Sequence, residues 1–162
     1  MLIGKPAIIR AAFGPSNKVN LLNVALAATE AVTITKARVY VQNTSDHLYF
    51  GIFFNTGGTN WKCRSATGDL GNVLAGFHEF DVTLPCQIDD CIGAYSDDTS
   101  SYFYYATAGG AGYWVVAGAN HCVVDDEASW TLVAGREASI EGESAGIGPG
   151  VGAPMAMLMG LI

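Results

Sequence analysis

Residues 61–84, WKCRSATGDLGNVLAGFHEFDVTL, contain the pattern that decides the fold. Along their second half polar and apolar side chains alternate, and the apolar phase holds His78, Phe80, Val82 and Leu84. A period of two residues is typical of a β-strand that buries one face. Between the halves, residues 68–73 (GDLGNV) contain two glycines and an asparagine, which adopt the positive φ angles of a chain reversal. The stretch therefore predicts a hairpin of two strands.

The β pattern continues towards the N-terminus. Residues 32–41 are rich in β-branched side chains, which favour strands. Val32 and Ile34 lie in one phase, whereas the apolar residues from Ala37 onward lie in the other, so we expect a bulge near Thr35 or Lys36. Residues 47–54 (HLYFGIFF) are apolar in both phases, which predicts a central strand covered on both sides.

The remaining strands recur at intervals of roughly ten residues. We expect them at residues 91–96, 101–107, 113–116, 130–133 and 137–141. The glycines of residues 109–112 (GGAG) predict a turn, and residues 23–31 are too short and poorly capped for a helix, so they are interpreted as a connection. The pattern predicts an all-β fold, an antiparallel sandwich or barrel of about eight strands.

Composition limits the functions open to the chain. Of its 162 residues, 50% are hydrophobic and only 14% are charged, and the net charge is −7. The eight Lys and Arg residues form no basic stripe, so we expect no nucleic-acid partner. The sequence has no apolar run of membrane-spanning length and no recognisable export signal, so no membrane span is expected. The small charged fraction suggests that neighbouring subunits cover part of the surface.

The four cysteines allow two interpretations. Cys86 and Cys91 bracket a short loop that a disulfide would close, and Cys63 would then pair with Cys122. The alternative is four reduced, buried thiols, since free cysteine is commonly buried. No C-x-x-C pair is present, so neither a zinc site nor another cofactor is expected.

Residues 146–162 differ from the rest of the chain. They are rich in glycine and then in methionine, and they contain no charged residue. We expect residues 1–145 to form the β domain and the last segment to form an arm on a neighbouring subunit, because an exposed apolar tail promotes aggregation. The arm would bury the side chains of Met155, Met157, Leu158, Met159, Leu161 and Ile162. A frayed terminus is the alternative.

No group of residues predicts catalysis. His78 is expected in the core, and no serine lies in a G-x-S-x-G elbow. Acids at residues 89–90, 97–98 and 125–127 are interpreted as solvated loop charge, with Ca²⁺ ligands or a glycosidase pair as alternatives. Aromatic side chains are the remaining signal. Exposed rings among Trp61, Tyr102, Tyr104 and Trp114 would stack on a glycan, whereas the alternative for these residues is core packing.

Five segments within residues 6–145 carry a resemblance to a known family. They are residues 7–10 (AIIR), 32–40 (VTITKARVY), 64–76 (RSATGDLGNVLAG), 90–95 (DCIGAY) and 138–142 (ASIEG). In these segments the chain resembles the jelly-roll domains of tailed-phage structural proteins and related environmental sequences. The resemblance implies an antiparallel jelly-roll β-sandwich, and it implies no catalytic residue. The four cysteines and the Met-rich tail depart from the family, so the extended terminal arms are expected from the tail segment itself.

These observations lead us to expect a non-enzymatic structural subunit. It would assemble with copies of itself or decorate a larger particle, either a virion capsid or tail or an extracellular filament. Its partners would then be further copies and other virion or filament proteins. A carbohydrate-binding module is the alternative, and a β-sandwich hydrolase is a third hypothesis.

Overall fold

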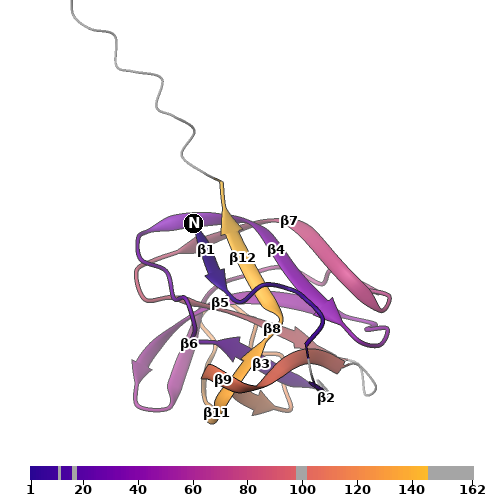
Figure 1. Ribbon diagram of the computed structural model, residues 1–162. Coiled ribbons are helices and arrows are strands. Elements are labelled where there is room, and N and C mark those ends of the chain that lie inside the picture. Colours follow the sequence, from indigo (N-terminus) through magenta and orange to yellow (C-terminus); the bar gives the residue numbers. More distant parts are fainter. Residues whose placement is uncertain (11, 16–17, 98–101, 146–162) are drawn as a thin grey trace, which may run out of the picture.

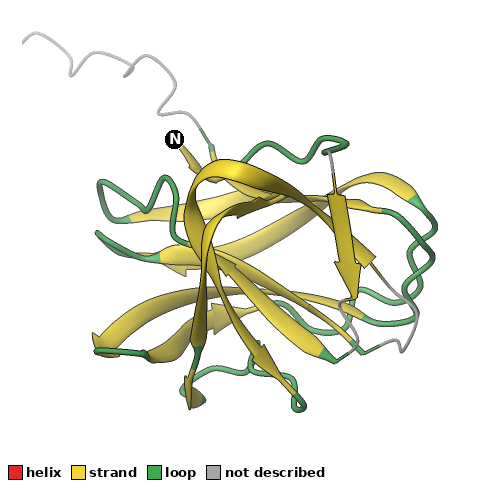
Figure 2. Ribbon diagram, turned by 60° about the horizontal axis from the view of Figure 1, so that its bottom comes forward, coloured by secondary structure: helices red, strands yellow, loops and turns green. Residues whose placement is uncertain are grey.

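The computed structural model describes residues 1–10, 12–15, 18–97 and 102–145, which form antiparallel strands joined by loops (Figure 1, Figure 2). In chain order the strands are β1 (Leu2–Gly4), β2 (Ala12–Pro15), β3 (Val19–Asn23), β4 (Val32–Val41), β5 (Leu48–Gly57), β6 (Asn60–Ala66), β7 (Gly76–Cys86), β8 (Cys91–Ser96), β9 (Tyr102–Ala117), β10 (Glu127–Ser129), β11 (Thr131–Ala138) and β12 (Ile140–Ser144). No helix occurs in this part of the chain, which confirms the all-β prediction. The strands outnumber the roughly eight expected because β1, β2, β3 and β10, which have three to five residues each, are too short to show a periodic pattern.

The strands form two layers (Figure 1). The first layer has the order β1-β12-β4-β7, and the second has the order β3-β8-β5-β6-β10. The long strand β9 joins them, since it pairs with β3 near its C-terminal end and contacts β4 through the pair Val41 and Phe103. β2 and β11 pair with other parts of β9.

Eight of the strands pair in a nested order. β1 pairs with β12, β3 with β8, β4 with β7, and β5 with β6. The β5–β6 connection joins the innermost of these pairs, and each layer contains two of the four pairs. β9, β10 and β11 are additions between β8 and β12.

The predicted hairpin of β6 and β7 is wrong. β6 pairs with β5 in the second layer and β7 pairs with β4 in the first, so the residues between them cross from one layer to the other. Backbone hydrogen bonds from Thr67 N to Phe50 O and from Leu70 N to Leu48 O hold this crossing, both at 2.9 Å. Alternation in β7 correctly indicated one buried face, but it carries no information about which strand is the neighbour.

The expected bulge in β4 is confirmed. The register between β4 and β7 shifts between Ile34 and Lys36, and the register between β4 and β12 shifts at the same place. Ile34 and Val39 lie on opposite sides of the shift, and both are fully buried. The extra residue thus returns the second half of the strand to the phase that faces the core.

The turn expected at residues 109–112 is absent, because β9 runs through it as one strand. β11 lies so close that a Cβ atom on Gly110 would be 2.7 Å from the carbonyl oxygen of Arg136. Gly112 has a φ angle of +106°, and the β9–β11 register shifts on both sides of Gly135. These glycines permit two irregular strands to approach each other closely. The sequence alone does not show whether such glycines serve close packing or a turn.

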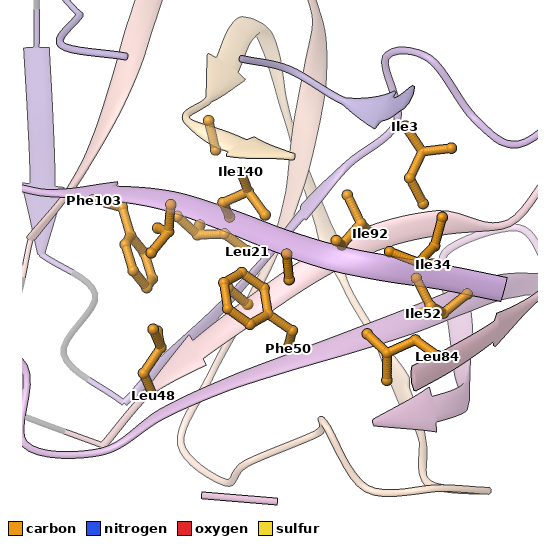
Figure 3. Packing of buried hydrophobic residues seen from close by; sticks show 14 of the residues in the cluster. Ile3, Leu21, Ile34, Leu48, Phe50, Ile52, Leu84, Ile92, Phe103 and Ile140 are labelled. Atoms are coloured by element: carbon orange, nitrogen blue, oxygen red, sulfur yellow. The ribbon is translucent and has the colours of Figure 1, made fainter. Parts of the chain in front are cut away.

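A hydrophobic core fills the space between the layers (Figure 3). The first layer contributes Ile34, Leu84 and Ile140, and the second contributes Phe50 and Ile92. Each of these side chains is at most 1% exposed. This packing fixes the layers relative to each other and leaves their two outer faces as the surfaces to compare.

Candidate functional site

The outer face of the first layer is the candidate site, and it is built from cross-strand rows. The register aligns Glu143, Lys36 and Asp81 in one row and Glu141, Arg38 and Glu79 in the next. We term this surface the charged face; it comprises Leu2, Lys36, Arg38, Tyr40, Phe77, Glu79, Asp81, Glu141 and Glu143.

Arg38 is the centre of the charged face. Its Nε donates to Glu79 Oε2 at 2.6 Å, its Nη1 donates to Glu141 Oε1 at 2.6 Å, and its Nη2 donates to Glu143. The hydrogen bonds from Arg38 and Lys36 hold the pKa of Glu79 below its ordinary value. A general acid for glycoside hydrolysis needs the opposite, a raised pKa, so this arrangement suits ion pairing better than proton donation.

The charged face has an acidic surplus. Lys36 lies 2.5 Å from Asp81 and 3.3 Å from Glu79, so each of the two cations is already shared between carboxylates. Four carboxylates and two cations leave two negative charges in excess. The Asp81 side chain is 88% exposed, so part of this charge faces solvent directly.

An aromatic row borders the charged rows. Phe77 pairs with Tyr40 across β7 and β4, and its side chain is 51% exposed. The Tyr40 ring packs edge-on against Tyr104, with centroids 5.4 Å apart. Phe77 lies in the polar phase of its strand, in line with Glu79 and Asp81. An aromatic residue in a solvent-facing phase is the sequence signal that could have predicted this exposed ring, and this signal was not used.

The residues expected to stack on a glycan are not gathered on one open surface. Trp61 is only 7% exposed, and its ring packs against Trp114 at a centroid distance of 5.9 Å. Tyr104 is half-buried beside Tyr40. The side chain of Tyr102 lies outside the described part of the structure.

The outer face of the second layer contrasts with the charged face because it is covered. We term its contents the aromatic–thiol cluster; it comprises Leu22, Phe53, Trp61, Cys63, Cys91, Tyr95, Cys122 and Trp130. The Phe53 ring lies over Gly51 of its own strand and Gly93 of the neighbouring β8, since a Cβ atom on Gly51 would be 2.7 Å from the ring and one on Gly93 would be 3.1 Å from it. Glycine at both positions therefore makes room for the ring.

Residues 118–130 form a roof over this cluster. Cys63 in β6 makes two backbone hydrogen bonds of 2.9 Å with the roof, accepting from Asp125 N and donating to Asp126 O. The buried side chain of Asn20 accepts from His121 N, and the His121 ring lies 2.7 Å from Asp126. The indole N–H groups of Trp61 and of Trp130, the last residue of the roof, are buried and have no hydrogen-bond partner in the described residues.

The predicted disulfides are wrong, because all four cysteines are free and buried. Cys86 faces the core from β7 in the first layer, whereas Cys91 faces the aromatic–thiol cluster from β8 in the second layer, so the second layer separates the two thiols. Cys63 and Cys122 share that cluster as reduced thiols. Burial raises the pKa of Cys63, Cys86 and Cys91 to about 12 and that of Cys122 well above its usual value, so these thiols are poor nucleophiles.

The acids interpreted as solvated loop charge prove to be partly structural. Asp90 is fully buried, and its Oδ2 accepts from Arg64 Nε at 2.5 Å and from Gln87 N at 2.7 Å. Asp125 pairs with Lys62 at 3.1 Å. Within the described ranges, no group of three or more His, Cys, Asp or Glu side chains is arranged to hold a metal ion.

A second exposed feature is apolar and borders β1. The segment at residues 26–29 runs beside this strand, since Gly4 N donates to Leu26 O and Thr29 Oγ1 lies 3.5 Å from Met1 Sδ. We term this surface the β1 edge; it exposes Leu2, Leu26 and Ile88 by 51%, 57% and 60%. Ile88 belongs to it because the neighbouring Asp89 N donates to Ala28 O.

The expected arm, including Met155, Met157, Leu158, Met159, Leu161 and Ile162, lies outside the described residues. Before that segment in sequence, Ser144 at the end of β12 donates its N–H to Met1 O at 2.9 Å, beside the β1 edge.

Comparison with known proteins identifies no relative, since no family model, curated protein or solved structure matches the chain. In the described ranges, no helix is of the length and hydrophobicity that crossing a membrane requires.

Proposed function

We propose that the chain is a non-enzymatic structural subunit with a jelly-roll fold, which assembles with copies of itself in a virion or an extracellular filament. The nested pairing of β1 with β12, β3 with β8, β4 with β7 and β5 with β6 supports the jelly-roll assignment, because a jelly roll is an antiparallel ribbon wound into two sheets. Capsid subunits and lectins both use this architecture, so the surface must distinguish between them.

The observation that carries the proposal is the β1 edge. Three large apolar side chains are more than half exposed there, on a chain with few charges, and Ser144, which precedes the uncharged segment 146–162 in sequence, donates to Met1 O beside them. Apolar surface of this kind marks protein contacts more often than small-molecule sites. Copies joined through this edge and through the arm would bury the side chains that solvent now contacts.

Sedimentation velocity over a range of concentrations tests this proposal. The full chain is expected to form large species as concentration rises. The double variant Leu26→Asn/Ile88→Ser is expected to assemble at least about tenfold more weakly, because two buried apolar side chains contribute more than 1.4 kcal/mol. Asparagine tolerates the left-handed backbone of Leu26, whose φ angle is +54°, so the variant is expected to fold.

The matched control is Val124→Ser, which removes an apolar side chain 55% exposed on the roof. It is expected to leave assembly unchanged. Deletion of residues 151–162 is expected to weaken assembly while the sandwich remains folded. A full chain that stays monomeric at every concentration would contradict the proposal.

A carbohydrate-binding module is the second candidate, and Phe77 is the observation that favours it. Its exposed ring beside Tyr40 adjoins carboxylates that could accept hydrogen bonds from sugar hydroxyls. A glycan array probed with monomeric protein separates the two functions: binding that Phe77→Ser abolishes would favour the module, whereas no binding together with assembly would favour the subunit.

A further inference from the structure

The charged face has properties that select for a partner of positive charge. Its two cations are saturated by their own neighbours, while its carboxylates remain in excess and accessible: the side chains of Asp81 and Glu143 are 88% and 40% exposed. The ion pairs with Lys36 and Arg38 use Asp81 Oδ1 and Glu143 Oε2, so an incoming cationic group can pair with the second oxygen of each carboxylate.

The charge of the whole chain strengthens this selection. At least seven of the eight Lys and Arg residues lie within 4.0 Å of a carboxylate. With a net charge of −7, two copies meeting through their charged faces would bring acidic surfaces together, which is unfavourable. The charged face is therefore unsuited to contacts between identical copies, unlike the apolar β1 edge.

The exposed aromatic ring gives the surface an apolar anchor. Phe77 lies in the row next to Arg38 and Glu79, so an incoming chain can contact the ring and the carboxylates together. Phe and Tyr rings also attract ammonium and guanidinium groups through their faces. Charge and apolar area in adjacent rows are the combination that a basic polypeptide segment with interspersed apolar residues would fit.

We propose that the charged face binds a basic polypeptide segment of a second protein, with Lys or Arg side chains at Asp81 and Glu143 and an apolar side chain on Phe77. This inference deepens the proposed function, since it names the chemistry of the partner that a structural subunit would meet beside its own copies. Leu2 borders both surfaces, but the other residues of the charged face are not part of the β1 edge. Because the variants that test each proposal leave Leu2 unchanged, the two proposals can fail independently.

Amide NMR shift mapping tests the binding site. The probe is a soluble peptide built of repeated Lys-Lys-Leu triplets, added to the full-length protein at a concentration where it is monomeric. Shifts are expected at residues 36–40, 77–81 and 141–143, and to weaken as salt is added. A matched peptide of Glu-Glu-Leu triplets is expected to cause none. Absence of Lys-Lys-Leu binding, or shifts centred on the roof acids at residues 125–127, would overturn the inference.

Substitutions then test whether the peptide binds to the charged face in particular or to any acidic part of the protein. Asp81→Asn/Glu143→Gln is expected to weaken peptide binding by about fivefold, since two exposed ion pairs are lost. Asp125→Asn/Glu30→Gln removes the same charge from exposed positions elsewhere and is expected to leave the affinity within twofold. Equal loss in both variants would overturn the inference.

Phe77→Ser is expected to weaken binding by about fivefold without altering its salt dependence. Loss of salt dependence in this variant, or unchanged affinity, would contradict the role of the ring. Sedimentation of the Asp81→Asn/Glu143→Gln variant is expected to match the unmodified chain, because copies assemble through the β1 edge. Failed assembly with intact peptide binding would therefore count against the proposed function and not against this inference.

Discussion

The two layers differ in what covers their outer faces. The first layer buries one face against the core and presents the charged face to solvent, and β7 alternates accordingly. The second layer buries both faces, one against the core and the other under the roof of residues 118–130. The second layer is thus expected to contribute more to stability, and the first layer is expected to meet partners.

The largest expected effect concerns the Phe53 ring, which packs against Trp130 with centroids 5.2 Å apart. Phe53→Ala would leave a cavity beneath the roof and is expected to lower the free energy of unfolding by about 3–5 kcal/mol. Phe77→Ala on the charged face is expected to change it by less than about 0.5 kcal/mol. Urea denaturation of both variants measures the difference, and equal losses would refute the contrast between the layers.

The buried ion pair of Asp90 with Arg64 is expected to matter next. Asp90→Asn leaves the guanidinium without its counter-charge, and because the Arg64 side chain is 32% exposed, water offsets part of the loss. We expect a loss of about 1–3 kcal/mol in the free energy of unfolding. The exposed pair offers the control: Asp125→Asn is expected to cost less than about 1 kcal/mol. Urea midpoints in the reverse order would show that Asp90 is not structurally important.

The glycines beneath the Phe53 ring provide a smaller test. Gly93→Ala would place a Cβ atom 2.7 Å from Leu21 O, with an expected cost of about 1–3 kcal/mol. Gly68→Ala meets no atom within 4 Å and is expected to stay within about 1 kcal/mol of the unmodified protein. Thermal melting of the two variants checks this, and a tolerated Gly93→Ala would mean that the ring does not need the space.

The smallest expected effects concern pH, and they have opposite directions in the two layers. The folded-state pKa of Glu79 lies below its ordinary value of 4.5, so its stabilising contribution is present above that pH and is lost as the pH falls through the lowered pKa. The pKa of Cys63 rises from 9.0 to about 12, so its contribution is present below pH 9 and is lost as the pH rises towards 12.

Melting temperatures as a function of pH measure both effects. Glu79→Gln is expected to flatten the decline in acid, and Cys63→Ala is expected to flatten the decline in alkali. Curves that remain parallel to those of the unmodified protein at both extremes would show that neither group is coupled to unfolding.

Local patterns predicted the parts of the fold that depend on burial alone. The phases of β4 and β7, the bulge near Thr35 and the doubly covered strand β5 follow from which side chains must avoid water. Pairing between strands did not follow, because β6 and β7 look like neighbours in sequence and yet enter different layers. The glycines of β9 were misread because close approach and chain reversal require the same residue.

The candidate site was only partly predictable from sequence. Arg38, Glu79 and Glu141 come from three strands, and only the register brings them together. The cysteine spacing suggested a disulfide, but Cys86 ends β7 in the first layer and faces the core, whereas Cys91 begins β8 in the second layer and faces the aromatic–thiol cluster. The exposure of Phe77 could be predicted from its position in the polar phase of its strand. Its contact with Tyr40 could not, because only the register between β4 and β7 places the two residues side by side.

Hydrogen–deuterium exchange of the full-length protein at low and high concentration tests most directly whether copies of the chain assemble through the β1 edge. Protection is expected to rise with concentration in β1 and in residues 26–29 and 86–90, while the roof of residues 118–130 exchanges at the same rate throughout. Exchange that is independent of concentration along β1, or protection gained only at the roof, would contradict assembly through the β1 edge.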